Sequence, residues 1–443
     1  MLLPNLFIYD LILFYMDKTN AKPGNYVEIH LTKLIYEGTL LESPETEKGL
    51  VLLKLDSGYN IGFNRKDILK IEVLRNEKDK EEREAVIKQD NNKPNIAMII
   101  TGGTIASVLD PKTGGVHPLQ KPEDFFRFYP KLFEKVNVVK VEIPFMKASE
   151  DMDFKDWQRI AKTAVSLLND SNIKGIIITH GTDFLHYTSA ALSFFLKDLN
   201  KPVVLTYSQR SIDRASSDAN LNLQCSALAA ISDMAEVMLV GHASPNDDYC
   251  HAMPGAKVRK FHSSRRDAFK VVNGKPYAKI FPDRIERISE WKIRNKGKAK
   301  LDDKFEEKVA LVKIYPGQDA DILDYYARKK YKGIILELSG LGHAPTKSSR
   351  NQWTRKLKEI QKKGIIICAT SQCIYGRVDP LVYSNGREIL NTGVIYLEDM
   401  LAETALVKLG WVLGHDEWKK NKKTVKEKML ENVAGELNER LEE

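Results

Sequence analysis

From Asn95 onward, short apolar runs alternate with segments of helical spacing, and this alternation restricts the fold more than any other feature of the chain. The runs are apolar throughout, as strands buried on both faces of a sheet are: NIAMII, KGIIITH, PVVLTYS and EVMLVGH. Between the first two lies FKDWQRIAKTAVSLLN, which repeats apolar residues at the spacing of one helix face. After a basic stretch the alternation resumes with KVALVKIY, KGIILELSG and GIIICATS. The pattern predicts an α/β body with a parallel sheet in two parts.

The region before this body differs from it. Residues 22–74 contain short β-branched and aromatic runs separated by turn residues, which predicts a small antiparallel barrel or sheet with an accessory role. With 443 residues the chain is also too long for one ordinary domain. We expect six parts: an apolar extension (1–21), the small β domain (22–74), a charged linker (75–93), a first α/β subdomain (94–283), a connector (284–307) and a second α/β subdomain with a terminal helix (308–443).

The first fifteen residues are apolar but too short to span a bilayer, and they lack a basic n-region and a cleavage site. They are either an over-extended gene start or a native extension, which N-terminal sequencing of the native protein distinguishes. The four cysteines show no C-x-x-C pair and no disulfide-framework spacing, which favours a reducing compartment. We therefore expect a cytoplasmic protein that does not contact a membrane.

Two motifs that carry hydroxyl groups stand where predicted strands end. TGGTIAS contains Thr104, and HGTD contains Thr182 and Asp183. In open α/β sheets, ligands bind outside the carboxyl ends of the strands, and glycines let the backbone bend sharply near a ligand. We therefore expect these three side chains at one rim of the sheet.

Each motif alone has a simpler interpretation. TGGT can be a structural glycine turn or a phosphate cradle, although neither a dinucleotide fingerprint nor a P-loop is present. In HGTD, Thr182 or Asp183 can cap the following helix, and His180 is interpreted as a hydrogen-bonded structural residue. The two motifs together, in this order, indicate an enzyme site.

Together the motifs resemble the two signature segments of the L-asparaginase/glutaminase family, and the similarity runs from about residue 95 to about residue 413. The resemblance implies an asparaginase-like fold and an amidohydrolase in which Thr104 is the nucleophile and Thr182 with Asp183 is the second catalytic pair. It also implies a lysine in AKVRKFHSSRRDAF, which is Lys260.

The same resemblance implies where substrate binds. Ser149 and Glu150, in KASEDMD, occupy the place where the family grips the amino-acid head of its substrate, and Asp183 is expected to bind the α-amino group. We expect no cofactor and no metal in this chain.

The chemistry of these residues is consistent with amide hydrolysis. A threonine hydroxyl is a poor nucleophile at neutral pH and needs a base, and attack by Thr104 would give an acyl-enzyme and free ammonia. Backbone N–H groups of the glycine turns would stabilise the oxyanion. Burial would favour a neutral Lys260, whereas Asp183 would favour the charged form, and the sequence leaves this balance open. The tyrosine that family members often carry after TGGT is absent, because DPKTGGVHPL offers only His117.

The N-terminal module and linker, joined to TGGTIAS and TGGVHP, are similar to the ammonia-producing subunits of tRNA-dependent amidotransferases. This resemblance implies that glutamine or asparagine is hydrolysed and that ammonia passes to a partner E subunit, which uses ATP and magnesium to convert Glu-tRNA(Gln) to Gln-tRNA(Gln). Because the family dimerises through the α/β body, an α2β2 assembly is expected. The alternatives are a stand-alone L-asparaginase, against which the N-terminal module argues, and a non-catalytic scaffold, against which the intact threonines, Asp183 and Lys260 argue.

The remaining features have no assigned chemistry. Residues 256–300 hold fifteen Lys/Arg and four Asp/Glu, which fits a surface for tRNA or an acidic partner and equally fits a solvated insertion. Cys250, His251 and His262 match no zinc template. We expect packing roles for Cys368 and Cys373, and for Trp353 and Trp411.

Overall fold

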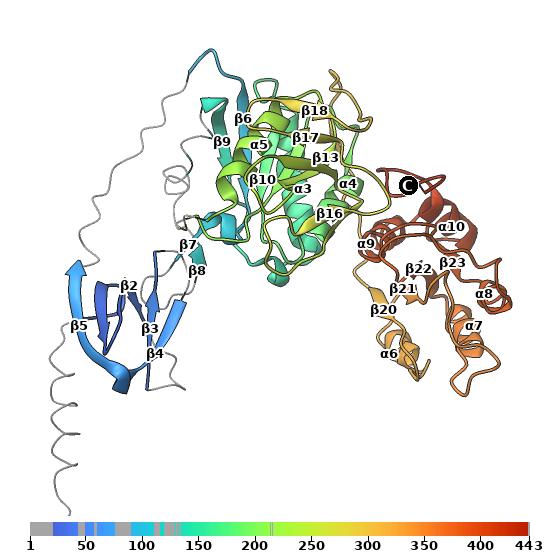
Figure 1. The fold of residues 1–443 in the computed structure, drawn as a ribbon. Coiled ribbons are helices and arrows are strands. Elements are labelled where there is room, and N and C mark those ends of the chain that lie inside the picture. The colour runs from blue at the N-terminus through green and yellow to red at the C-terminus, as the bar shows by residue number, and fades with distance from the viewer. Residues whose placement is uncertain are drawn as a thin grey trace, which may run out of the picture. The chain divides into compact units, whose positions relative to one another are not determined.

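The structure is a computed structural model, and it describes residues 21–42, 49–56, 60–75, 90–109, 116–118, 129, 132, 134–212, 214 and 216–441 (Figure 1). The predictions for residues 1–20 and for most of the linker lie outside these residues. The chain divides into two compact units. The first comprises 1–88, 104–130 and 210–219, and the second comprises 89–103, 131–209 and 220–443. Each unit is described by itself.

The first unit contains a five-stranded antiparallel sheet in the order β4-β3-β2-β1-β5. Alternate residues of its strands face a small core that includes Val27, Ile29, Leu53 and Phe63, as period-2 patterning requires. The predicted small antiparallel domain is thereby confirmed. Its strands are β1 (Tyr26–Leu31), β2 (Ile35–Leu41), β3 (Leu50–Lys54), β4 (Asn60–Asn64) and β5 (Ile68–Arg75). The unit also contains the 3-10 turns η1 (Arg65–Asp67) and η3 (Thr104–Ala106), and the strand pair β7 (Ser107–Leu109) and β8 (Val116–Pro118).

The second unit is built on an eight-stranded sheet in the order β18-β17-β14-β13-β12-β10-β6-β9. The four predicted apolar runs form neighbouring parallel strands, β6, β10, β12 and β13, with β9 parallel at the edge. Beyond β13 the sheet continues with three antiparallel strands from residues in which the sequence predicted no strand. The strands are β9 (Asn137–Glu142), β6 (Asn95–Ile100), β10 (Ile176–Thr179), β12 (Val203–Thr206), β13 (Val237–His242), β14 (Cys250–Pro254), β17 (Ala278–Ile280) and β18 (Ile285–Arg287).

Helices and short strand pairs complete this part of the second unit. The helix predicted from FKDWQRIAKTAVSLLN is present, capped by Asp153 and Asp156 in a reciprocal capping box. The helices are α3 (Phe154–Leu168), α4 (Leu185–Phe195) and α5 (Ala219–Ile231). The short pairs are β11 (Leu196–Lys197) with β19 (Lys300–Leu301), and β15 (Val258–Lys260) with β16 (Phe269–Val271). The expected connector, 284–307, thus contributes β18 and β19 to regular structure.

A second sheet of four parallel strands, in the order β20-β21-β22-β23, follows the connector. Its helix α9 (Ala402–Leu413) is buried along nearly its whole length and packs against both α4 and β21, so the two sheets share one hydrophobic core. The remaining elements are β20 (Val309–Lys313), β21 (Gly333–Leu338), β22 (Ile366–Ser371), β23 (Ile395–Tyr396), α6 (Ile322–Arg328), α7 (Thr354–Lys362), α8 (Ser384–Leu390) and α10 (Lys422–Leu430).

The segment that follows α10 is anchored by buried polar contacts. Glu436 pairs with Lys408 of α9 at 2.5 Å, and both side chains are fully buried. Asn438 bonds to both carboxylate oxygens of Asp399, and Asp399 pairs at 2.5 Å with Lys257, just before β15. The C-terminal segment therefore contacts the same buried network as the strand that contains Lys260.

Two further sequence predictions are tested by the fold. Trp353 and Trp411 are buried, as expected, and so is Cys368, whereas Cys373 is exposed and the packing role predicted for it is wrong. Cys373 lies in the loop after β22, beyond the buried part of that strand. Across the described residues, no helix has the length and apolar character needed to cross a membrane.

Candidate active site

The two sequence motifs meet through their glycines. Gly103 follows β6 in a left-handed conformation with φ +81°, and a Cβ there would lie 2.4 Å from the backbone nitrogen of Gly181. A side chain at Gly103 would push the two strand ends apart, because its contacts are with backbone, whereas a side chain at Gly181 would meet Ser149 at 3.0 Å. The hydroxyl of Thr101 donates to the carbonyl of Thr179 at 2.7 Å and adds a second link between the ends of β6 and β10.

Lys260 joins the two side chains of the second motif. Its Nζ donates to the Thr182 hydroxyl at 2.8 Å and to Oδ1 of Asp183 at 2.7 Å. The lysine side chain is 11% exposed and the aspartate side chain is 60% exposed. The arrangement therefore holds an amine, a hydroxyl and a carboxylate in direct contact at the edge of solvent.

Ser149 fixes the backbone of this motif. The buried Ser149 hydroxyl accepts from the N–H groups of Asp183 (3.1 Å) and Phe184 (3.3 Å), and donates to Glu150 at 3.4 Å. Helix α4 begins after Phe184 and has no side-chain cap. The alternative interpretation of Thr182 and Asp183 as helix caps is therefore wrong. Glu150 itself is exposed.

His180 serves the structure of the motif, as its position in the sequence predicted. It is fully buried, and its ring contacts the carbonyl of Gly181 at 2.7 Å and the hydroxyl of Thr188 at 2.9 Å. Burial lowers the pKa of His180 to about 4, so the ring is neutral near pH 7. A neutral ring that is bonded on both nitrogens holds the loop and carries no charge into the site.

Thr104 lies in the other unit, as the first residue of η3, directly after Gly103. Its role as nucleophile stays a prediction. Tyr129, which no sequence motif singled out, is buried in the same unit and donates to the carbonyl of Ile105 at 3.1 Å. It lies far along the chain from TGGT, so no local pattern pointed to it.

An open depression of about 380 Å³ lies beside Lys260, which is large enough for a small polar substrate. Its walls come from the loop before α4, the start of α4, the hairpin after β15 and the start of α9. They consist of Asp183, Phe184, His186, Tyr187, Arg259, Lys260, Phe261, His262, Ser263 and Glu403. Arg259 and Glu403 were not predicted as site residues.

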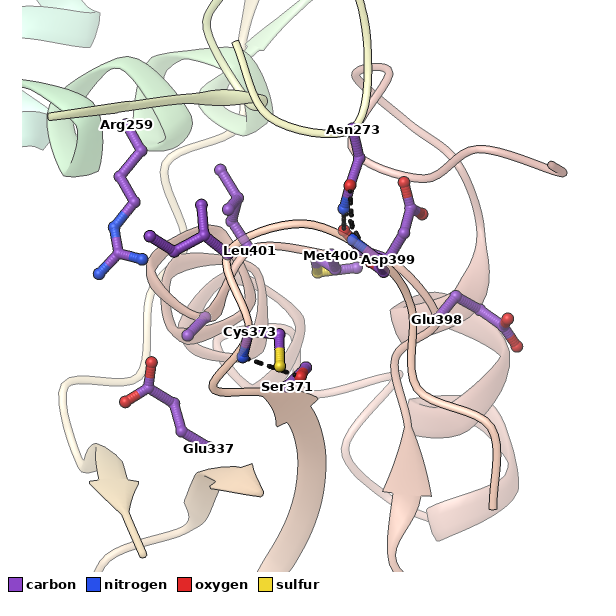
Figure 2. A pocket seen from close by; sticks show the side chains of 12 residues that line it. Arg259, Asn273, Glu337, Ser371, Cys373, Glu398, Asp399, Met400 and Leu401 are labelled. Atoms are coloured by element: carbon purple, nitrogen blue, oxygen red, sulfur yellow. Dashed lines mark hydrogen bonds between the residues drawn. The ribbon is translucent and has the colours of Figure 1, made fainter. Parts of the chain in front are cut away.

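A second, much smaller pocket lies on the other side of Arg259 (Figure 2). Its volume of about 10 Å³ is the size of one water molecule and is too small for an amino acid. Figure 2 shows the guanidinium of Arg259 and the carboxylate of Glu337 pointing toward each other across it. Of the two pockets that Arg259 lines, the open depression is therefore the one with room for a substrate.

Among the described residues, one group has the geometry of a metal site: Glu28, His30 and Glu72 bring ligand atoms within 4.8 Å of one another. Lys70 lies 2.7 Å from Glu72, and His30 lies 2.5 Å from Glu28. These pairings already use the potential ligands, so the group gives no support for a metal.

Family models match three parts of the chain: Asparaginase, N-terminal, over residues 95–292; the Glutaminase/Asparaginase C-terminal domain over 308–429; and the GatD N-terminal domain over 21–74. Among solved structures, the thermostable L-asparaginase from Thermococcus kodakarensis is 29% identical with a TM-score of 0.68. The match covers 100% of that asparaginase chain and 78% of this chain. L-asparaginase I from Vibrio cholerae is 28% identical with a TM-score of 0.66, covering 78% of this chain and 99% of that one.

Curated relatives match almost the full length. The D subunit of glutamyl-tRNA(Gln) amidotransferase from Pyrococcus abyssi is 45% identical over 432 residues, 96% of each chain. The protein of the same name from Methanobrevibacter smithii is 41% identical over 430 residues, again 96% of each. The L-asparaginases match only the α/β body, whereas these relatives also match the N-terminal module. The chain thus belongs to the family of glutamyl-tRNA(Gln) amidotransferase D subunits, with an asparaginase-type amidohydrolase body.

Proposed function

We propose that this chain is the amide-hydrolysing subunit of an enzyme that converts Glu-tRNA(Gln) to Gln-tRNA(Gln). The observation that carries the proposal is the contact of Lys260 with both Thr182 and Asp183 at the mouth of a substrate-sized depression. The relatives named as D subunits of such an enzyme, and the N-terminal module shared with them, support the tRNA-dependent role over a stand-alone L-asparaginase.

The proposed reaction uses Thr104 as the nucleophile. Its hydroxyl oxygen attacks the side-chain amide carbon of glutamine or asparagine, and its proton passes through Thr182 and Lys260 to the amide nitrogen. Ammonia then leaves, an ester to Thr104 remains, and water hydrolyses it to the free acid. Asp183 orients Lys260 and binds the α-amino group of the substrate together with Glu150, while Ser149 holds the loop that contains Asp183.

The released ammonia would pass to a partner E subunit, where ATP and magnesium activate the glutamyl-tRNA. We propose a cytoplasmic α2β2 assembly in which two copies of this chain pair through their α/β bodies. We propose that tRNA(Gln) is bound by the whole complex and not by segment 256–300 of this chain alone. The charged side chains of that segment are largely paired with groups within this chain. Arg259, Arg294 and Lys300 illustrate this, because they bond to Glu403, to main-chain carbonyls and to Asp198.

The test is ammonia release from glutamine and from asparagine by the full chain, alone and with the E partner and Glu-tRNA(Gln). Thr104→Val and Thr182→Val should each lower the rate by about 10³-fold or more, because a positioned hydroxyl is lost. Thr163→Val is the matched control, since Thr163 lies on helix α3 and its hydroxyl donates to the carbonyl of Arg159. Unchanged turnover by Thr104→Val would exclude it as nucleophile. Rapid asparagine hydrolysis without partner or tRNA would favour the stand-alone enzyme.

A further inference from the structure

The strand that contains Lys260 is tied to the second sheet by charged residues. Along residues 257–260 successive side chains alternate in direction, as they do in any strand. Lys260 points to Thr182 and Asp183, whereas Arg259 pairs with Glu403 at the start of α9 and Lys257 pairs with Asp399. Lys260 is therefore preceded in the chain by two residues whose side chains are held by Glu403 and Asp399.

The Arg259–Glu403 pair is the closer of these ties to the site. Arg259 Nε lies 2.9 Å from Oε1 of Glu403, whose side chain is 9% exposed. Glu403 Oε2 is buried and, within the described part of the chain, meets no hydrogen-bond donor. Across the small pocket, Glu337 points toward the same guanidinium (Figure 2). Burial raises the pKa of Glu337, Lys313 and Arg259 lower it, and the negative charge of Glu403 raises it. One guanidinium thus faces two carboxylates, and Glu403 is the one that holds it in place.

The positive charges of Arg259 and Lys260 both act on a neighbouring side chain of α4, His186. His186 on α4 has its pKa lowered to about 3, first by burial and then by the positive charges of Arg259 and Lys260. The groups that face Lys260 are Thr182 and Asp183 from the loop before α4, His186 and Tyr187 from α4, His262 from the hairpin, and Arg259 with Glu403.

We propose that Arg259, held by Glu403, is a positioning residue that sets the direction of the Lys260 side chain. Glu403 belongs to α9, so a helix that packs on the second sheet helps to place the amine used in the first. The inference rests on the proposed amide hydrolysis.

The test is steady-state kinetics of glutamine hydrolysis by the full chain with its partner subunit, comparing Glu403→Gln, Arg259→Gln and Arg259→Lys with wild type. Each glutamine variant should lower kcat about tenfold, with KM changed less than about twofold, because the amine is misplaced but the substrate contacts remain. Arg259→Lys keeps a cation that can pair with Glu403, so it should recover most of the lost kcat.

Glu436→Gln is the matched control, because it breaks another buried ion pair on α9, with Lys408, away from the depression. It should lower thermal stability while leaving kcat within about twofold of wild type. The inference is overturned if Glu403→Gln and Arg259→Gln lower kcat no further than Glu436→Gln does, or if they raise KM and leave kcat unchanged. If Glu403→Gln does not fold, the contrast between Arg259→Gln and Arg259→Lys decides. A wild-type protein that releases no ammonia would defeat the proposed function itself. If the wild type is active, Thr182→Val is inactive and the Arg259 variants have wild-type kinetics, this inference fails while the proposed function stands.

Discussion

Two lysine–carboxylate pairs in the same α/β body have nearly the same geometry and opposite surroundings. Lys408 and Glu436 lie 2.5 Å apart with no exposure, and Lys408 also donates to the carbonyls of Met429 and Glu431. Glu436 in turn accepts from main-chain N–H groups of the C-terminal segment. Lys260 and Asp183 lie 2.7 Å apart, but the carboxylate is largely exposed, and the other described partner of the amine is a hydroxyl.

The difference separates a structural pair from a chemical one. A buried pair whose remaining donors and acceptors are all bonded has one stable charge state, and removing either member leaves an uncompensated charge. At the Lys260 site, a hydroxyl that can lose its proton takes the place of a main-chain carbonyl, and solvent reaches the carboxylate. Proton transfer therefore needs a site in which some hydrogen-bond donors and acceptors are not yet fully bonded. The distance between the two charges alone does not show this difference.

The largest effect is expected from Lys260→Met, which keeps the length of the side chain and removes its charge. Amide hydrolysis should fall by about 10³-fold or more, because Thr182 loses its proton partner. The free energy of unfolding should change by less than about 1 kcal/mol, since the aspartate left behind is exposed. Ammonia release and urea unfolding measure the two quantities. Retention of more than a tenth of the wild-type rate would remove Lys260 from the mechanism.

Lys408→Met should give the reverse pattern. It leaves Glu436 buried without its cation, which should reduce the free energy of unfolding by about 3–5 kcal/mol. The rate at 25 °C should stay within a few-fold of wild type while the protein remains folded. Urea unfolding measures the loss, and the double variant Lys408→Met/Glu436→Leu should recover part of it. A loss below about 1 kcal/mol would mean that burial does not distinguish the two pairs.

A smaller effect extends the comparison to a group that is buried without a charge. His180 has a pKa lowered from 6.5 to about 4, so below pH 6.5 the unfolded chain binds a proton that the folded chain does not. Its contribution to stability is complete above pH 6.5 and is lost as the pH falls toward 4, by about 3 kcal/mol. His186 and His251 contribute in the same direction. His180→Gln should therefore flatten the pH dependence of urea unfolding that comes from these histidines by about a third, and an unaltered profile would contradict a neutral, buried His180.

Local patterns in the sequence predicted a large part of the fold. Four apolar runs form β6, β10, β12 and β13, because strands buried on both faces need no alternation and so stand out. The site was predictable where a motif follows such a strand, and the structure brings Thr182, Asp183 and Lys260 together. The antiparallel extension by β14, β17 and β18 was missed, since these strands are only three to five residues long and charged residues interrupt β17 and β18.

Contacts between residues far apart in the sequence explain the rest. The basic segment 256–300 was interpreted as either a surface for tRNA or a solvated insertion, but Lys257 and Arg259 are used inside the fold. Their partners, Asp399 and Glu403, lie more than a hundred residues along the chain, and no local pattern announces such a pairing. The role of Thr104 stays a prediction, because η3 belongs to the other unit.

The anchoring of the C-terminal segment has a consequence for synthesis of the protein. Glu436 and Asn438 leave the ribosome after every other member of the network that includes Lys408, Asp399 and Lys257. Until they emerge, Lys408 lacks its carboxylate partner and Asp399 lacks the N–H donors of Asn438. Chains truncated before Glu436 should accordingly be less stable to urea than the full chain.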